Sequence, residues 1–330
     1  MDDAVSAREA PAGAGPATPA AGPPAAAAAA EPVAAANAAG PANAAGPVGS
    51  ANAAGPVGSA TADLATADAV AGGPVAPWRP PLFWRFALGF ARGLTGCVCR
   101  LRVTGELPAA LRDGPVILAA NHIGAFDPIA LTAACAKIRV APRIMATGGL
   151  FRARVVGPLM RHAGHLRVDR RRPNVTDAYD TAQVALAARS VVLGYPEGRI
   201  TLDPGMWPER GKTGLARLAI ATGVPVVPVS QWGAHLVLPW GAPRGMWRRL
   251  VWSALHRPVV AVHFGAPLHA GSDQSARAVW ELTDRIIDAI TEGLVPLRAT
   301  EPGLPAWTDP QRPVTTARTR RPRAARAGTT

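Results

Sequence analysis

The sequence is poor in the residues that build disulfide frameworks and metal centres. It has 3 cysteines in 330 residues, and two of them, Cys97 and Cys99, lie too close in the chain to pair comfortably. No C-x-x-C or H-x3-H pair and no cluster of carboxylates completes a metal coordination set. We therefore expect reduced thiols, a cytoplasmic location and no bound metal.

Two further absences limit the chemistry. The chain has no G-x-S-x-G nucleophile elbow, and Ser190 and Ser230 have no local base beside them in the sequence. The best candidate for a membrane-spanning helix, residues 82–99, contains Arg85 and Arg92. Each arginine would cost about 2.5–3.5 kcal/mol at the centre of a bilayer. The sequence thus disfavours both a serine nucleophile and a spanning helix.

Composition divides the chain into three parts. Residues 1–77 consist mainly of Ala, Gly and Pro, include a nine-residue repeat (43–51 and 52–60) and lack the large apolar groups that form a core. Such a segment is predicted to be disordered. Residues 299–330, rich in Arg and Pro, are predicted to form a second disordered tail. Residues 78–298 remain for one folded domain.

The positive charge of the chain belongs to this domain. The formal net charge is +13, whereas residues 1–77 have six acidic residues and one Arg. A basic folded domain indicates anionic partners, which include nucleic acid, phospholipid headgroups and phosphorylated small substrates.

Apolar strands alternate with helices along this domain, which predicts an α/β fold with a largely parallel central sheet covered by helices on both faces. If the strands are parallel, His122, Glu197 and Val229 lie at one edge of the sheet. The strands are expected near residues 100–104, 115–120, 140–146, 165–168, 191–195, 225–230 and 258–264, and the helices near 80–98, 128–137, 151–162, 174–189, 212–222 and 274–292.

The stretch Asn121-His-Ile-Gly-Ala-Phe-Asp127-Pro holds a histidine and a carboxylate five residues apart, where a strand is followed by a helix. In open α/β sheets ligands bind at such junctions. A carboxylate that returns to the imidazole fixes its tautomer while the other ring nitrogen takes a proton. The pattern predicts that His122 deprotonates an alcohol. The alternative is a helix-capping Asp127 and a histidine packed beneath the helix.

Further blocks follow in a fixed order. They are a stretch that ends in Arg170, the turn Tyr195-Pro-Glu-Gly-Arg199, and the apolar strand Val224-Pro-Val-Val-Pro228. Together with His122 and Asp127 they resemble the four-motif signature of the glycerolipid acyltransferases, the family of bacterial 1-acylglycerol-3-phosphate acyltransferases. The resemblance covers roughly residues 80 to 290. The sequence departs from the family at Arg199, where a small residue is more common.

The resemblance implies transfer of an acyl group from acyl-CoA or acyl carrier protein to lysophosphatidic acid, which forms phosphatidic acid without a cofactor. His122 would be the base and Asp127 would orient it. Two alternatives stay open: an acyltransferase for another lyso-lipid or a glycolipid, and a non-catalytic basic protein that binds membrane or nucleic acid. The intact His122–Asp127 pair speaks against the second alternative, so no nucleic acid is expected.

An anion site is also predicted. By resemblance, Arg170 contacts the phosphate of the acceptor. Arg199 and Lys212 lie beside the Glu197-Gly198 turn and at a helix start, where backbone amides favour anions. Glu197 is either an acid catalyst or, as we prefer, the carboxylate that holds these arginines in place.

Membrane contact is predicted for residues 82–99. Aromatic residues there (Phe83, Trp84, Phe86 and Phe90) alternate with arginines, as in a helix that lies in the headgroup plane. Residues 246–255 repeat this mixture. Both segments can instead be ordinary amphipathic cover for the core. Because lipid substrates have insoluble tails, we expect a peripheral, monotopic protein on anionic phospholipid at the cytoplasmic face of the cell membrane.

Overall fold

The computed structural model describes residues 76–169, 175–240 and 245–320. The N-terminal segment predicted to be disordered falls almost entirely outside these residues, as do Arg170 and the last ten residues.

The centre of the fold is a seven-stranded sheet in the order β1-β7-β6-β2-β5-β3-β4. Neighbouring strands are parallel except for β6 and β7, which are antiparallel. This confirms the predicted fold class. The strands are β1 (Arg100–Gly105), β2 (Val116–Ala120), β3 (Pro142–Thr147), β4 (Leu166–Val168), β5 (Val191–Gly194), β6 (Val226–Trp232) and β7 (Val259–Phe264).

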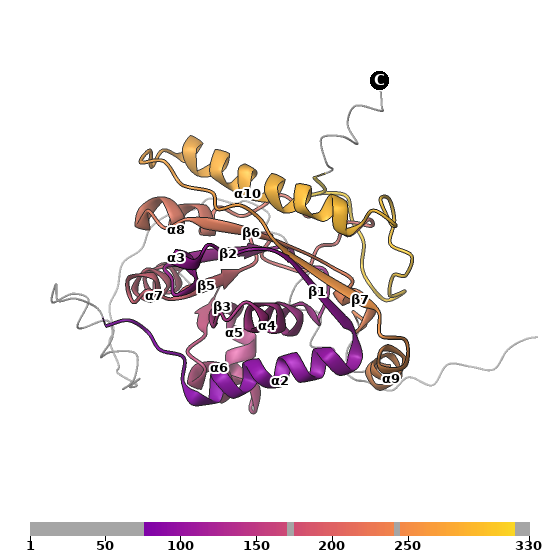
Figure 1. Ribbon diagram of the computed structural model, residues 1–330. Coiled ribbons are helices and arrows are strands. Elements are labelled where there is room, and N and C mark those ends of the chain that lie inside the picture. The colour runs from indigo at the N-terminus through magenta and orange to yellow at the C-terminus, as the bar shows by residue number, and fades with distance from the viewer. Residues whose placement is uncertain (1–75, 170–174, 241–244, 321–330) are drawn as a thin grey trace, which may run out of the picture. The chain divides into compact units, whose positions relative to one another are not determined.

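Helices cover both faces of the sheet (Figure 1). One layer contains α7, α8 and α10, and the other contains α2, α4, α5 and α6. The helices are α2 (Leu82–Val98), α3 (Ala109–Arg112), α4 (Asp127–Lys137), α5 (Gly148–Arg152), α6 (Val156–His162), α7 (Val175–Ala187), α8 (Gly214–Thr222), α9 (Met246–His256) and α10 (Ala276–Leu297), with a 3-10 turn, η2 (Ala234–Leu236).

Alternation along the buried strand β2 creates two cores. Ile117 and Ala119 belong to the core beneath α8 and α10. Val116, Leu118 and Ala120 belong to the core that includes α4 and Trp84 of α2. A strand that is apolar on both faces suits the centre of a parallel sheet. Because β2 runs parallel to both β5 and β6, the carboxyl ends of the three strands lie side by side, and the loops that follow them come together, as the sequence predicted.

Two expected helices differ from the prediction. The helix expected over residues 151–162 is split into α5 and α6: Ala153 is extended, and Pro158, which suits only the first turn of a helix, lies in the first turn of α6. Gly157 lies so close to the carbonyl of Phe151 that a side chain there would come within 2.2 Å of it. The guanidinium of Arg161 donates to the same carbonyl at 2.7 Å. The last helix, α10, extends to Leu297, five residues beyond the predicted end.

The prediction of a disordered C-terminal tail is wrong for residues 299–320, which we call the C-terminal strap. This segment follows α10 and turns back along the domain (yellow in Figure 1). The amide of Thr315 donates to the carbonyl of Leu202 at 2.8 Å, and that of Arg210 donates to the carbonyl of Arg318 at 2.9 Å. Asp309 and Arg312 are buried. The strap is therefore part of the folded domain, which extends beyond the predicted boundary at residue 298.

At the root of the strap, Arg298 is fully buried. Its guanidinium lies between the rings of Trp207 and Trp232, at 3.9 and 4.1 Å from their centres. It donates to the carbonyls of Gly205 at 2.7 Å and Gly303 at 2.8 Å. The buried charge is thus surrounded by acceptors and aromatic faces, which compensate for its loss of water.

Candidate active site

The end of β2 is fixed to β6 by two amide side chains. Asn121 donates from Nδ2 to the carbonyl of Gln231 at 3.0 Å and accepts from its amide at 2.8 Å. Gln231 donates from Nε2 to the carbonyl of Asn121 at 2.7 Å. The asparagine that precedes His122 therefore sets the direction in which the next loop leaves the sheet.

His122 and Asp127 meet as predicted. The distance between Nδ1 of His122 and Oδ2 of Asp127 is 2.7 Å. The same carboxylate oxygen accepts from the amides of Ile123 at 2.5 Å and Gly124 at 2.9 Å, and Asp127 is fully buried at the start of α4. Because Nδ1 faces the carboxylate, Nε2 is the ring nitrogen that remains for a substrate proton.

Gly124 lets this loop pass close to η2, since a side chain there would come within 3.2 Å of the backbone of His235. The His122 ring also stacks on Tyr195, with ring centres 4.1 Å apart and an angle of 15° between the planes. Tyr195 follows β5, so two adjacent strands fix the imidazole from its carboxylate side and from one face.

The Glu197 side chain contacts backbone amides. Its carboxylate is fully buried and accepts from the amide of His122 at 3.0 Å and from that of Glu209 at 2.9 Å. Burial raises the pKa of Glu197 to about 8, although the two amide donors oppose the rise. Glu197 therefore holds the backbone of the His122 loop and that of Glu209, and the hydrogen bonds described for its carboxylate come from these amides and not from an arginine.

The residue that does pair with an arginine of the turn is Glu209. Its two carboxylate oxygens accept from Nε and Nη2 of Arg199, each at 2.9 Å, and Arg318 of the strap lies 3.8 Å away. The hydrogen bond to Glu209 raises the pKa of Arg199. Two of the Arg199 donors that were predicted to bind a phosphate are thus engaged by Glu209. Sequence reasoning missed Glu209, because Trp207-Pro-Glu-Arg210 carries no motif.

Residues 100–232 match the protein family described as Acyltransferase. The chain contains a domain of the acyltransferase family. Among solved structures, it is similar to PlsC from Thermotoga maritima, a 1-acyl-sn-glycerophosphate (LPA) acyltransferase. The two chains are 19% identical, the match covers 66% of this chain and 80% of that one, and the TM-score is 0.49. No curated protein matches the sequence.

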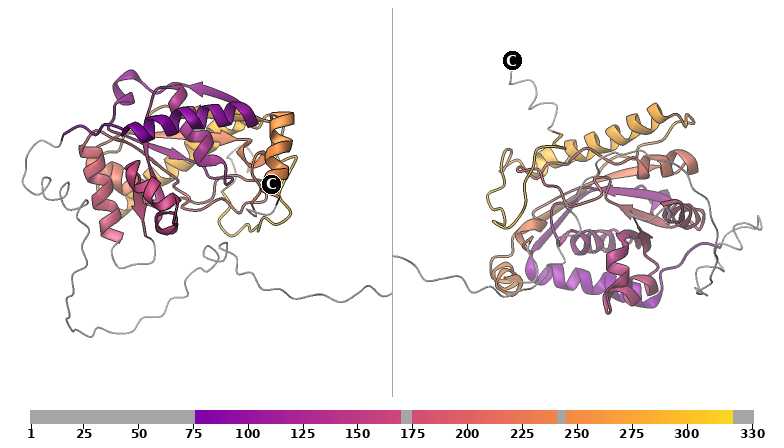
Figure 2. Two further views of the ribbon diagram at one scale, coloured as in Figure 1. Left: turned by 90° about the horizontal axis from the view of Figure 1, so that it is seen from below. Right: turned by 180° about the vertical axis from the view of Figure 1, so that it is seen from behind.

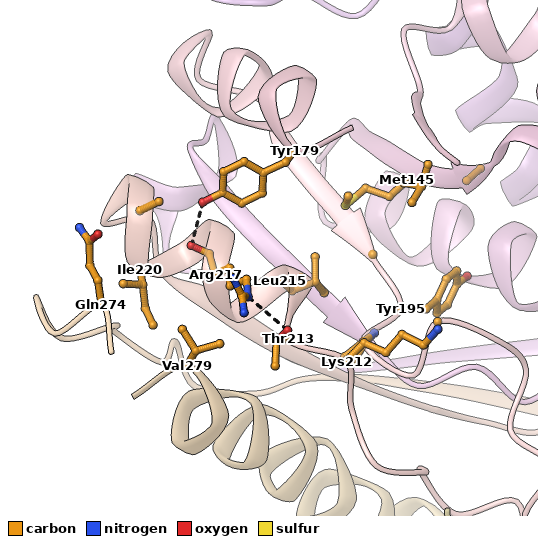
Figure 3. A pocket seen from close by; sticks show the side chains of 17 residues that line it. Met145, Tyr179, Tyr195, Lys212, Thr213, Leu215, Arg217, Ile220, Gln274 and Val279 are labelled. Atoms are coloured by element: carbon orange, nitrogen blue, oxygen red, sulfur yellow. Dashed lines mark hydrogen bonds between the residues drawn. The ribbon is translucent and has the colours of Figure 1, made fainter. Parts of the chain in front are cut away.

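A pocket of about 830 Å³ lies beside the loop that follows β5 (Figure 3). Tyr195 and Lys212 line one end, and Ile220, Gln274 and Val279 line the other. Gly198 also lines the pocket. Leu215 and Met145 lie between the ends, so the walls are mainly apolar. The pocket thus extends from Tyr195, the residue stacked on His122, into a mainly apolar space.

The predicted anion-binding residues lie in different surroundings. Gly198 and Lys212 line the pocket, whereas Arg199 is paired with Glu209. Arg170 lies outside the described residues. Three residues before it, Arg167 pairs with Asp169 at 2.6 Å.

Within the described ranges, no group of three His, Cys, Asp or Glu side chains is placed to hold a metal ion. None of the helices in the same residues combines the length and the apolar character needed to cross a bilayer. The three cysteines of the chain, all of them described, are free thiols.

Proposed function

We propose that the protein transfers an acyl group from acyl-CoA or acyl carrier protein to the hydroxyl of 1-acyl-glycerol-3-phosphate, with phosphatidic acid as the product. The observation that carries this proposal is the His122–Asp127 pair beside the apolar pocket that begins at Tyr195. An alcohol needs a base in order to attack a thioester, and a long apolar chain needs an apolar space.

In the proposed reaction Nε2 of His122 removes the proton of the acceptor hydroxyl. The hydroxyl oxygen attacks the thioester carbonyl and forms the new ester bond, while the carbon–sulfur bond breaks. The departing thiolate receives the proton from His122. Asp127 stabilises the charged imidazolium between these steps, and its bonds to Ile123 and Gly124 keep it in place.

The pocket is proposed to hold an acyl chain, with its reacting end near Tyr195 and its tail near Ile220 and Val279. Lys212 at the reacting end is proposed to attract the acceptor phosphate together with Arg170, the assignment of which rests on the family resemblance. Arg199 is proposed to support the turn through Glu209 and not to bind phosphate directly.

Two helices support a peripheral contact with anionic membrane. Leu82, Phe86 and Phe90 of α2 are 67, 76 and 72% exposed. On α9, which packs near α2 (Figure 2), Trp247, Val251 and Leu255 are also exposed. Trp84 does not belong to this surface: it is buried and donates from its indole N–H to the carbonyl of Pro142 at 3.2 Å.

The test is thiol release from acyl-CoA and from acyl carrier protein by the purified protein, with lysophosphatidic acid, neutral lyso-lipids and lyso-glycolipids as acceptors. We expect turnover that depends on an acceptor and is fastest with lysophosphatidic acid. His122→Ala should lower it by about 10²–10⁴-fold, the usual contribution of a general base. If the variant keeps more than about a tenth of the activity, His122 is not the base. Equal rates with neutral acceptors would reject the phosphate site.

Chain length tests the pocket separately. Ile220→Trp fills its far end, so turnover with a long-chain donor should fall while turnover with a short-chain donor persists. Equal losses for both donors would mean that the acyl chain lies elsewhere.

A further inference from the structure

The catalytic loop and the Glu197 turn are joined through the backbone of His122. The amide of His122 donates to Oε1 of Glu197 at 3.0 Å, and its carbonyl accepts from the amide of Thr201 at 2.7 Å. The turn therefore holds both backbone polar groups of the proposed base. The residues next to these two bonds, Ile123 and Thr201, are buried. Their backbone carbonyls therefore need hydrogen-bond donors from the protein.

Arg312 of the C-terminal strap supplies both donors. Its Nη1 donates to the carbonyl of Ile123 at 2.6 Å, and its Nη2 donates to the carbonyl of Thr201. Arg312 is only 7% exposed and lies 189 positions after Ile123 in the chain. One planar guanidinium thus closes a ring of hydrogen bonds that runs through His122, Thr201 and Ile123.

Charge fits this placement as well. Burial lowers the pKa of Arg312, while Asp127, Glu197, Asp309 and Asp203 favour its charged form, in that order of effect. Asp127 is the carboxylate that orients His122. The guanidinium therefore lies beneath the catalytic loop as a cation among buried acidic side chains. A lysine at this position can carry the charge, but a single ammonium lacks the fixed fork that reaches two carbonyls together.

We propose that Arg312 is a positioning residue for the catalytic loop, which holds Ile123 and Thr201 at a fixed separation and thereby aims Nε2 of His122 at the substrate. The residue lies in the strap, about 80 positions beyond the stretch that matches the acyltransferase family. The predicted effect on turnover rests on the proposed function, whereas the effect on the loop does not.

The first experiment compares kinetic constants of three full-length variants. Arg312→Met keeps the volume and removes charge and donors, and Arg312→Lys keeps the charge. Arg320→Gln is the matched control, because Arg320 also anchors the strap through an ion pair but does so on α10, with Asp284 and with Asp288 at 3.0 Å. We expect kcat of Arg312→Met to fall by about 10²-fold, as for a displaced catalytic group, with little change in KM for either substrate. Arg312→Lys should recover part of this loss, and Arg320→Gln should stay within a few-fold of wild type.

The second experiment measures amide hydrogen exchange over residues 121–127. The amides of Ile123 and Gly124 are held by Asp127, so they report directly on the loop. Exchange should be faster in Arg312→Met than in Arg320→Gln. This measurement needs no turnover, so it decides the positioning role even if the wild-type protein transfers no acyl group. If Arg312→Met does not fold, Arg312→Lys provides the comparison.

Three results would overturn the proposal. One is a folded Arg312→Met variant with kcat close to wild type. Another is a raised KM with kcat retained, which would make Arg312 a binding residue. The third is loop exchange equal to that of Arg320→Gln, which would mean that the strap and not Arg312 itself supports the site.

Discussion

Glu209 is a fully buried carboxylate beside the candidate active site. Arg199 donates two hydrogen bonds to this carboxylate, and the backbone amide of Glu209 donates to Glu197. Removal of one partner from a buried ion pair leaves the other charge without compensation, and this costs more than the pair contributes when intact. At the scale of single residues, Glu209 should therefore matter more for stability than any exposed ion pair of the domain.

We predict that Glu209→Gln lowers the free energy of unfolding by about 3 kcal/mol, the lower end of the range for a broken buried pair, since the Arg199 side chain is 23% exposed. Glu281→Gln is the control. It breaks the exposed pair of Arg277 and Glu281 on α10, so no measurable change is expected. Urea unfolding of both variants gives the comparison. Equal effects would show that the Glu209 pair is solvated.

Glu197 predicts a pH dependence of stability. Its pKa is about 8 in the folded protein against an ordinary value of 4.5, so between these values the folded state binds the proton more tightly than the unfolded state. The stabilisation is complete below the unfolded value and is lost as the pH rises through about 8. Between about pH 5 and 8, wild type should therefore lose stability relative to Glu197→Gln, by at most about 1.4 kcal/mol per pH unit. If the unfolding free energies of wild type and Glu197→Gln change in parallel across this range, the raised pKa of Glu197 is contradicted.

The sequence predicted His122 and Asp127 because both lie in one short loop, where spacing alone brings them together. It could not predict Glu209 or Arg312, since their partners are distant in the chain and their roles depend on tertiary contacts. Glu197 was recognised as a site residue, but its bonds to backbone amides cannot be read from a motif.

Helix α2 has an inner and an outer face. Trp84 packs into the core and also stacks edge-on against His165, with ring centres 4.4 Å apart. Phe86 and Phe90 point away from the domain. The four aromatic residues of this helix thus do not form one surface, although they lie close together in the sequence.

At the scale of this element, Phe86→Ser with Phe90→Ser should abolish sedimentation with anionic vesicles and leave the melting temperature unchanged, since only exposed rings are lost. Trp84→Ala should instead lower stability by about 3–5 kcal/mol, as for truncation of a buried aromatic residue. Val295→Ser removes a half-exposed apolar residue of α10, in the opposite layer, and serves as the control for vesicle binding. If the double variant still sediments fully, Trp247 and its neighbours on α9 become the expected contact.

Most elements could be predicted because their apolar spacing is local. All seven strands lie where the sequence placed them, within about two residues at each end. Apolar spacing alone did not predict the division between α5 and α6, where Pro158 lies in the first turn of the second helix.

At the scale of the whole described domain, the strap is the part that composition misjudged. Its Arg and Pro content is typical of disordered tails, yet its arginines contact carboxylates and carbonyls of distant loops and of α10. No periodicity marks these contacts, since each depends on a partner more than 30 positions away.

A chain that ends after Gly303 should therefore be less stable than one that ends after Arg320. The shorter chain loses both charged hydrogen bonds of Arg312, and such bonds contribute about 1.5–3 kcal/mol each. We expect a decrease of about 3 kcal/mol or more in the free energy of unfolding. The chain ending after Arg320 keeps every contact described for the strap and should match the full-length protein. Equal stability of both truncated chains would show that the strap is dispensable for folding.

The distance along the chain between Thr201 and Arg312 also has a meaning in time. During synthesis both loops of the active site emerge more than a hundred residues before the guanidinium that joins them. At the usual rate of translation this interval lasts roughly 5–20 s. Throughout this interval the nascent domain contains His122 and Asp127 but lacks the two hydrogen bonds that Arg312 donates. Full activity should therefore appear only when Arg312 has been synthesised and has folded back onto the two loops.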